Sequence, residues 1–432
     1  MNICIIGLGY VGLTLALSMA DSGIRVYGVD SKKETVDSLK KGNSTISEKD
    51  SEKILLKTLN QEFFVSEKIP NEEIDAFIIS VGTPLNENKS PIMDHIINSS
   101  TDVGRKLKKG QMVILRSTIP VGTTREIVIP ILEKESNLQS GNDFDVVFAP
   151  ERTAEGVALL ELKTNPQIIG GLTEIGMDRA SQLFSKMTST IVPVSSIESA
   201  EMVKLIDNTY RDVHFAYANE IAIICEMLNI NARECIEKAN FNYSRNKIPM
   251  PSPGVGGPCL SKDSYILTHV ASKFNYEPNL IKHGRLVNEF IPSFMVKKII
   301  KKLESLEKNK EVKIFIIGFA FKGDPETGDI RSSSTLTVVS ELKKKYNNLF
   351  GFDPVVESKE IEQLNVKYVN VEEGIKDADC IIVMNNHKSY RELNMKKLLK
   401  NASKPCLFVD CWSMFQEISF EKEIIYTGVG LD

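Results

Sequence analysis

The sequence has few of the features that mark metal centres, disulfide frameworks and membrane spans. Its five histidines are isolated, without HxH or HExxH spacing, so we expect no metal site. Its seven cysteines are scattered, odd in number and free of any CxxC pair, which favours a reducing, cytoplasmic compartment. No stretch approaches ~20 uninterrupted apolar residues, so we expect no segment to cross a bilayer.

An excess of charge of one sign is also missing. The 53 Lys+Arg and 57 Asp+Glu leave a net charge of −4, and no long basic block indicates nucleic acid or an anionic membrane as a partner. The apolar N-terminal run has no basic segment and is interrupted by Gly7, Gly9 and Gly12, so we expect no signal peptide. The 432 residues, 42% of them apolar, are typical of a globular protein of two to four domains.

Short apolar runs alternate with helical stretches at both ends of the chain. A strand at 3–7, a helix at 11–23 and a strand at 25–30 open the sequence. Further strands are predicted at 76–84, 112–118, 145–150, 166–171 and 190–195, and again at 314–322, 348–354, 366–370, 380–386, 407–412 and 424–430. Strands that alternate with helices predict parallel sheets covered on both faces. We therefore expect an α/β fold with two doubly wound, Rossmann-like domains.

The middle of the chain is predicted to be helical. Apolar residues recur with helical spacing over 198–229, and no strand is predicted between 197 and 308. One loop, 249–258, holds four prolines and three glycines, which forbid regular structure. A loop of this kind inside a helical domain is usually functional. We place the domain boundaries at 1–196, 197–308 and 309–432.

A glycine-rich turn follows the first strand and opens the first helix. In Gly7-Leu8-Gly9-Tyr10-Val11-Gly12 the first glycine permits the turn, the second lets the backbone approach a pyrophosphate, and the third lets helix pack on strand. Asp30 ends the next strand, where its carboxylate can accept from a ribose hydroxyl and repel a 2′-phosphate. The motif predicts NAD as cofactor; the alternative is a tight turn without a ligand. Gly318 repeats the strand-then-glycine pattern without the full motif, so that domain should bind something else by its loop.

Four polar residues lie at or just after the carboxyl ends of predicted strands of the first domain. Thr83, Thr118, Glu151 and Glu155 would all lie at the carboxyl edge of the sheet, where open α/β sheets bind ligands. Each could also belong to a simple strand-ending turn. A pair of carboxylates at this edge could do acid–base work or bind hydroxyls.

Two polar residues on the apolar helix are spaced one turn apart. Lys204 and Asn208 project from one face as a cation and an amide donor, which could together hold an oxyanion. The alternative is a solvated stripe that continues to Arg211.

Cys259 follows the glycine- and proline-rich loop and precedes a predicted helix that contains Asp263 one turn later. A thiol at a helix N-terminus has its thiolate stabilised by the dipole. With a nicotinamide cofactor, such a thiolate can add to an aldehyde, and loss of hydride then leaves a thioester for water to cleave. The alternative, a small core residue, suits Cys4, Cys225 and Cys380 better.

These motifs resemble the nucleotide-sugar 6-dehydrogenases, the UDP-glucose/GDP-mannose dehydrogenase family. The resemblance rests on segments in all three predicted domains: GLGYVG (7–12), VGTP (81–84), STIPVGTT (117–124), APERTAEG (149–156), 201–222, PSPGVGGPCLSKD (251–263) and GFAFKGDPETGDIRSSST (318–335). It implies oxidation of a sugar C6 alcohol to a carboxylate with two NAD. The implied roles are Cys259 as nucleophile, Lys204 and Asn208 as oxyanion donors, Asp263 beside the hydrolytic water, and Thr118 and Glu155 around catalysis and cofactor.

The resemblance also implies how the ligands bind. NAD would lie on the first domain, with Gly7, Gly9, Tyr10, Val11, Gly12, Asp30, Thr83, Thr118, Glu155 and, from the C-terminal domain, Arg331. The nucleotide sugar would be held by Glu151, Lys204, Asn208, Arg245, Met250, Gly254, Gly256 and Lys322, with the nucleotide on the C-terminal domain. The helical domain would join two subunits into a homodimer or a higher oligomer, so that Arg245 could serve the neighbour's site.

Within the family, residues 151–156 and 248–259 resemble the N-acetylhexosamine branch, and 410–415 lacks the arginine of some glucose enzymes. A UDP-N-acetylhexosamine, first UDP-N-acetyl-D-mannosamine, is therefore the expected substrate; UDP-N-acetylglucosamine, UDP-glucose and GDP-mannose are alternatives. Two readings outside the family stay open: a two-electron hydroxyacid dehydrogenase, and an NAD-binding protein without catalysis.

Overall fold

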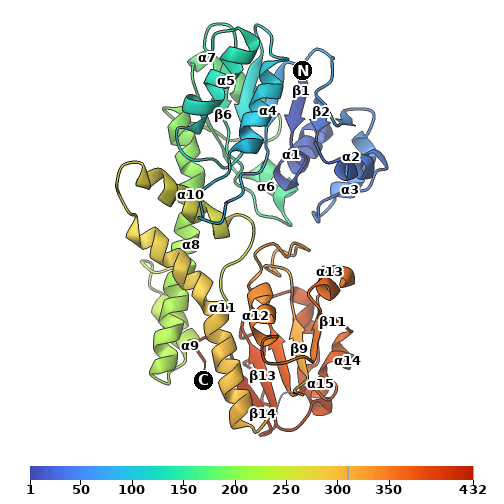
Figure 1. Ribbon diagram of the computed structural model, residues 1–432, viewed down its shortest axis with the longest axis vertical. Helices are drawn as coiled ribbons and strands as arrows, with labels where there is room; N and C mark the ends of the chain where they lie inside the picture. The colour runs from blue at the N-terminus through green and yellow to red at the C-terminus, as the bar shows by residue number, and fades with distance from the viewer. Residues whose placement is uncertain (309–310, 432) are drawn as a thin grey trace. The chain divides into compact units, whose positions relative to one another are not determined.

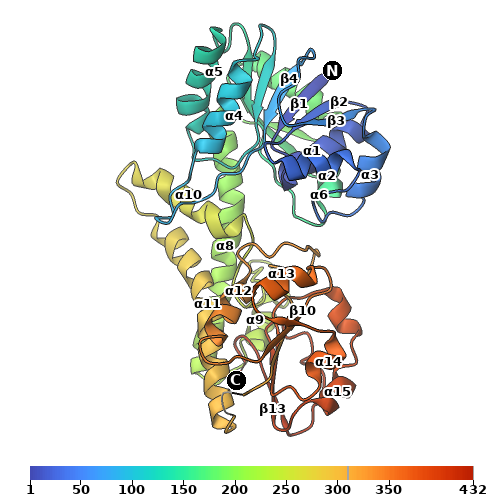
Figure 2. The same cartoon turned by 45° about the vertical axis from the view of Figure 1, so that its right-hand side comes forward.

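The computed structural model describes residues 1–308 and 311–431, which form two compact units. The first comprises Met1–Asp207 and Tyr265–Glu277, and the second comprises Asn208–Ser264 and the chain from Pro278 onward. The long helix α8 (Ile197–Met227) contributes residues to both (Figures 1 and 2). The three-domain division stays a prediction, and residues 309, 310 and 432 of its last domain lie outside the described residues.

The first unit is built on an eight-stranded sheet. Its strand order is β3-β2-β1-β4-β5-β6-β7-β8, and all neighbours pair parallel except β6 and β7. The strands are β1 (Asn2–Ile6), β2 (Arg25–Val29), β3 (Phe63–Ser66), β4 (Ala76–Ile79), β5 (Met112–Leu115), β6 (Asp145–Phe148), β7 (Gln167–Gly171) and β8 (Ile191–Pro193). The predicted α/β fold is confirmed, and β3 is a strand that the prediction missed.

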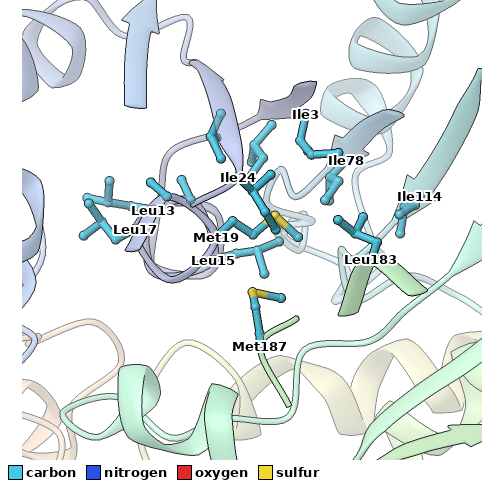
Figure 3. Close-up of a cluster of buried hydrophobic side chains, with 14 of the residues drawn as sticks. Ile3, Leu13, Leu15, Leu17, Met19, Ile24, Ile78, Ile114, Leu183 and Met187 are labelled. Atoms are coloured by element: carbon cyan, nitrogen blue, oxygen red, sulfur yellow. The ribbon is translucent and has the colours of Figure 1, made fainter. Parts of the chain in front are cut away.

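Both faces of this sheet are covered, as the continuous apolar runs of its strands require. Ile3 and Ile5 of β1 belong to one buried cluster, whereas Cys4 and Ile6 belong to the cluster on the opposite face. Figure 3 shows part of the first cluster, with Leu15 of α1 (Tyr10–Asp21) among the labelled side chains. The other helices are α2 (Lys33–Lys40), α3 (Ser51–Thr58), α4 (Asp94–Gly104), α5 (Ile129–Ser136), α6 (Ala158–Thr164), α7 (Glu174–Phe184) and the π-helical turn Thr124–Val128.

The second unit holds a six-stranded, all-parallel sheet in the order β11-β10-β9-β12-β13-β14. Its strands are β9 (Ile314–Ile317), β10 (Leu349–Phe352), β11 (Lys367–Tyr368), β12 (Cys380–Val383), β13 (Cys406–Asp410) and β14 (Ile424–Thr427). Its helices are α12 (Ser334–Leu342), α13 (Ser358–Gln363), α14 (Val371–Ile375) and α15 (Met395–Leu398), with 3₁₀ turns at Lys388–Glu392 and Leu399–Asn401. Ile314 and Ile316 face one buried cluster and Phe315 and Ile317 the other, so this sheet is also covered on both sides.

The predicted central helices are confirmed. After α8 come α9 (Ala232–Asn240), α10 (Leu260–Ser272) and α11 (Asn279–Ser305), and the loop at 249–258 contains neither helix nor strand. Met295 and Ile299 of α11 join the apolar cluster that covers one face of the second sheet. Over residues 1–308 and 311–431, no helix has the length and apolar character to cross a membrane.

Candidate active site

The glycine-rich turn has the geometry that a dinucleotide requires. Gly7 has φ +91°, and a Cβ at Gly12 would lie 1.8 Å from the Gly7 carbonyl oxygen, so both positions need glycine for the fold itself. A Cβ at Gly9 would meet no protein atom within 4 Å. Packing therefore does not explain Gly9, whereas close approach of a pyrophosphate to the backbone does.

Asp30 lies directly beside this turn. Its Oδ2 accepts a 2.8 Å hydrogen bond from the Leu8 N–H, and its Oδ1 accepts from the Lys32 N–H at 2.9 Å. The carboxylate is thereby fixed at the carboxyl end of β2, where it can reach a ribose hydroxyl. The turn and the carboxylate together fit NAD.

Thr83 and Thr118 meet at the carboxyl ends of β4 and β5. The buried Thr83 hydroxyl donates to the Thr118 carbonyl oxygen, and Ser117 Oγ donates to the Val81 carbonyl oxygen at 2.7 Å. These bonds join two strand-ending loops at the ligand edge of the sheet. Thr83 therefore shapes this edge, and its contact with the cofactor stays a prediction.

A buried carboxylate that sequence reasoning missed connects the glycine-rich turn to the segment that carries Glu155. Glu48 accepts a hydrogen bond from the Tyr10 hydroxyl, and the Gly156 N–H donates to both Tyr10 Oη and Glu48 Oε2 at 2.8 Å. The partly buried Glu155 precedes that amide. Burial first and Glu48 second raise the pKa of Tyr10, so its hydroxyl remains a donor. Glu48 lies in a polar stretch of the sequence that gave no signal of this role.

Glu151 and Lys204 form a buried ion pair. Lys204 Nζ lies 3.1 Å from Glu151 Oε2, and Lys204 is 5% exposed. Burial raises the pKa of Glu151, but Lys204, Thr153 and Arg116 outweigh it and hold this pKa below the ordinary value. The pair therefore places a carboxylate and a cation together at the ligand edge of the first unit.

In the second unit, Asn208 and Asp263 meet beside the backbone of Cys259. Asn208 Nδ2 donates to Asp263 Oδ2, and Lys262 Nζ lies 2.7 Å from Asp263 Oδ1. Asp263 N–H donates to the Cys259 carbonyl oxygen at 3.0 Å, which places the half-buried cysteine just before α10. Sequence reasoning found all three residues but not Lys262.

The solvated-stripe alternative for α8 is wrong. Asn208 is 1% exposed and, like Lys204, turns inward, whereas Arg211 is exposed and donates to Asn208 Oδ1 at 2.6 Å. This bond fixes the orientation of the Asn208 amide, with its nitrogen toward Asp263. A polar stripe on an apolar helix is consequently part of a buried site here.

Two glycines of the loop are required by packing. A Cβ at Gly254, which has φ +102°, would lie 2.9 Å from the Asn288 carbonyl oxygen, and one at Gly256 would lie 2.3 Å from the Ser332 carbonyl oxygen. At both positions the loop backbone therefore lies too close to its neighbours to leave room for a side chain: to α11 at Gly254, and to the 318–333 segment of the same unit at Gly256. A direct role of either glycine in binding a sugar stays a prediction.

The remaining predicted site residues lie on the second unit. Lys322 lies half-buried beside the Phe321 ring, whereas Arg331 is exposed and pairs with Asp329 at 2.8 Å. Arg245 is exposed after α9, and Met250 is half-buried in the loop. Over residues 1–308 and 311–431, no three His, Cys, Asp or Glu side chains are placed to hold a metal ion.

Comparison with known proteins matches three models of the UDP-glucose/GDP-mannose dehydrogenase family: the NAD binding domain to residues 1–188, the central domain to 198–290 and the UDP binding domain to 315–417. UDP-N-acetyl-D-mannosamine dehydrogenase from Campylobacter jejuni is 34% identical over 92% of this chain and 98% of its own. NDP-N-acetyl-D-galactosaminuronic acid dehydrogenase from Ralstonia nicotianae is 30% identical over 92% and 93%. The structure of the UDP-D-ManNAc dehydrogenase from Pyrococcus horikoshii matches with a TM-score of 0.90 and 32% identity, over 100% of this chain and 99% of that one. The chain therefore belongs to the UDP-glucose/GDP-mannose dehydrogenase family and is an NAD-dependent nucleotide-sugar dehydrogenase.

Proposed function

We propose that the enzyme oxidises C6 of a UDP-N-acetylhexosamine, first of all UDP-N-acetyl-D-mannosamine, to the uronic acid. The observation that carries the proposal is the similarity over more than nine-tenths of the chain to relatives named for that substrate. Another relative, at 30% sequence identity, is named for an N-acetyl-D-galactosaminuronic acid. The experiment must therefore determine which epimer of the hexosamine is oxidised. The acetamido group needs room and a polar partner, which residues 151–156 and 245–256 would supply.

Cys259 is the proposed nucleophile. When bound, NAD supplies the hydride acceptor, one molecule for each of two oxidations. After the C6 alcohol has become an aldehyde, Cys259 Sγ adds to its carbonyl carbon and forms a thiohemiacetal. Loss of the second hydride leaves a thioester on Sγ, and attack by water releases the carboxylate and frees the thiolate. The position of Cys259 just before α10 supports this role because a helix N-terminus stabilises a thiolate.

Lys204, Asn208 and Asp263 are the proposed partners of that chemistry. An ammonium and an amide nitrogen can donate to the oxyanion of each tetrahedral intermediate. The Asn208 amide carries two N–H groups, so it can donate to Asp263 and to an oxyanion together. Asp263, held by Asn208 and Lys262, would accept a proton from the attacking water. Thr118 and Glu155 would act beside them at the cofactor.

The residues proposed to hold the ligands are those predicted from the sequence. We assign NAD to the glycine-rich turn, Tyr10, Val11, Asp30, Thr83, Thr118, Glu155 and Arg331. We assign the nucleotide sugar to Glu151, Lys204, Asn208, Arg245, Met250, Gly254, Gly256 and Lys322. The support is the fingerprint geometry for the cofactor and the matched UDP binding domain for the nucleotide.

A homodimer built on α8 is proposed as well. Tyr210 is 64% and Met227 73% exposed, and with Ile206, Tyr217 and Ile224 they follow one side of the helix. An exposed apolar stripe of this length fits a second copy of the chain better than solvent. A monomer in light scattering at micromolar concentration would refute the dimer and, with it, a role of Arg245 in the neighbour's site.

Two experiments test the function. A panel of UDP-ManNAc, UDP-GlcNAc, UDP-GalNAc, UDP-glucose and GDP-mannose, assayed by NADH formation, should favour a hexosamine by more than ~10-fold in kcat/KM. Preferential oxidation of UDP-glucose or GDP-mannose would refute the substrate but not the chemistry.

The second experiment concerns the nucleophile. Two NADH should form per sugar; Cys259→Ala should abolish acid formation, and Cys259→Ser should stop at a tightly held intermediate. One NADH with a free aldehyde would refute the thioester route and favour a two-electron dehydrogenase, which alkylation of Cys259 would leave active.

A further inference from the structure

A buried polar network lies beside the loop that carries Cys259, and the chemistry proposed above does not use it. Arg285 of α11 is 1% exposed, and its Nη1 lies 3.0 Å from Oδ1 of Asp212, a fully buried residue of α8. Asn288 Nδ2 donates to the same carboxylate at 2.8 Å, and Ser264 Oγ donates to Asp212 Oδ2 at 2.7 Å. The carboxylate thus orients the guanidinium from a fixed point on α8.

The guanidinium also holds the backbone on both sides of the cysteine. Arg285 Nη2 donates to the Val255 carbonyl oxygen at 2.9 Å, and Nη1 donates to the Leu260 carbonyl oxygen at 3.2 Å. Between these two acceptors lie Gly256-Gly257-Pro258-Cys259, which form neither helix nor strand. Two glycines give this segment little conformational preference of its own, so its path depends on groups that hold it from outside.

Stability alone does not account for a charged pair at this place. Two charges lose their hydration when buried, and apolar side chains of similar volume often stabilise a core as well or better. A guanidinium, however, offers donors in a rigid planar fork that can reach two carbonyl oxygens and a carboxylate at once. No apolar side chain can fix two carbonyl oxygens in this way.

We propose that Arg285 is the positioning residue for Cys259: oriented by Asp212, it holds the carbonyls of Val255 and Leu260 and thereby fixes the thiol at the N-terminus of α10. The proposal rests on the proposed role of Cys259 as nucleophile. Arg285 itself touches neither substrate nor cofactor in this scheme; it acts through the backbone that flanks the thiol.

The test compares two Arg→Lys variants of the full-length enzyme. Arg285→Lys keeps the buried charge but cannot make three directed contacts. The matched control is Arg179→Lys on α7. Arg179 also bridges a carboxylate and a carbonyl: it donates to Asp145 at 2.6 Å and to the Gly110 carbonyl oxygen at 2.9 Å. These partners lie at the edge of the first sheet that is opposite to its ligand edge. Melting temperature is recorded for every variant, so that loss of fold and loss of position are separated.

For R285K we expect kcat to fall by about 100-fold with KM for the nucleotide sugar within about threefold, because misplaced reacting groups cost rate more than binding. Alkylation of Cys259 by iodoacetamide, followed by peptide mass spectrometry without sugar, should slow by about tenfold, because a displaced thiol loses the helix dipole that stabilises its thiolate. The exposed Cys235 in the same sample should label at an unchanged rate. R179K should change none of these quantities by more than twofold.

Ser264→Ala provides a second variant that removes a neutral donor from Asp212 and leaves the charge pair in place. We expect kcat to fall by about threefold to tenfold at unchanged KM, with a smaller slowing of Cys259 alkylation. The proposal is overturned if R285K keeps kcat and alkylation within twofold of the parent, or if S264A changes neither. Because alkylation needs no sugar, it reports on Arg285 even if the thioester route itself is refuted.

Discussion

The first strand of each sheet ends in the same backbone turn, at Gly7 and at Gly318. The two units differ in the segment that follows this glycine. In the first, the Gly7 N–H donates to the Val29 carbonyl oxygen at 2.8 Å; in the second, the Gly318 N–H donates to that of Phe352 at 2.8 Å. Both glycines have positive φ, +91° and +97°. The first chain segment then enters α1 at once, whereas the second continues through residues 319–333 before α12 begins.

The carboxylates beside these turns show what the divergence changes. Asp30 and Asp353 both accept from the residue after the glycine, Leu8 at 2.8 Å and Phe319 at 2.7 Å. Asp353 accepts in addition from the Ala320 N–H and from Asn385 Nδ2, and it is buried. Asp30 is partly exposed and makes fewer such bonds.

The comparison teaches how one turn can serve two ligands. Where the helix starts at once, a Cβ at Gly9 would meet no protein atom within 4 Å, and the Asp30 carboxylate remains available to a ribose. Where a long loop follows, the carboxylate holds the start of that loop, and the loop carries Lys322, which is proposed above to bind the nucleotide sugar. Recognition of the nucleotide sugar is therefore expected from loop side chains in the second unit.

The largest effect that would test this comparison comes from the glycine that has no counterpart in the second sheet. Gly12→Ala should abolish NAD binding and destabilise the first unit, because the new methyl group would lie 1.8 Å from the Gly7 carbonyl oxygen. Gly9→Ala is the control: it should keep the melting temperature and raise KM for NAD by about tenfold, since the pyrophosphate loses its close approach. NAD titration and thermal unfolding decide the matter, and normal NAD affinity in G12A would contradict the fingerprint.

The next effect separates the two carboxylates. Asp353→Asn should lower the free energy of unfolding by roughly 2–4 kcal/mol, because several hydrogen bonds to a buried charge are weakened. Asp30→Asn should lower it by less than about 1 kcal/mol and instead reduce the preference for NAD over NADP. Urea unfolding and the ratio of kcat/KM for the two cofactors are the measurements. Equal stability losses in the two variants would show that the carboxylates do the same work.

Prediction from sequence succeeded where the determinants are local. Buried parallel strands are continuous apolar runs, so nearly all were located, although β4 ends at Ile79, within the predicted range 76–84. β3 was missed because Phe63–Ser66 is a four-residue edge strand within polar sequence. Glu48 and Arg285 could not be found, since each has a partner far away in the chain: Gly156 lies 108 residues from Glu48, and Asp212 lies 73 residues from Arg285. Asp212 could have been found from the sequence, because it continues the four-residue spacing of Lys204 and Asn208.

A pH experiment compares one buried carboxyl from each unit. Lys204 and its neighbours lower the pKa of Glu151 against burial, so its contribution to stability is present above the ordinary value of 4.5 and is lost as pH falls below it. Burial raises the pKa of Asp410, so the folded protein takes up that proton first and gains stability as pH falls toward 3.8. Urea unfolding at pH 7, 5 and 4 measures how much free energy of unfolding each substitution removes. The loss caused by Glu151→Gln should shrink on acidification, and the loss caused by Asp410→Asn should grow. The same trend in both variants would contradict the opposite shifts.

The smallest effect concerns the bond by which the fingerprint helix holds the 151–157 segment. Tyr10→Phe removes a hydroxyl that donates to Glu48 and accepts from the Gly156 N–H, but that N–H keeps Glu48 Oε2 at 2.8 Å. Because one acceptor remains, we expect a loss of about 1 kcal/mol in the free energy of unfolding and a rise in KM for NAD of about twofold to threefold. Tyr27→Phe on β2, whose ring stacks on Phe64, is the matched control and should change neither value. If Y10F and Y27F are indistinguishable in urea unfolding and in NAD kinetics, the Tyr10 hydroxyl contributes nothing to this connection, and Glu48 alone fastens the segment to the cofactor-binding unit.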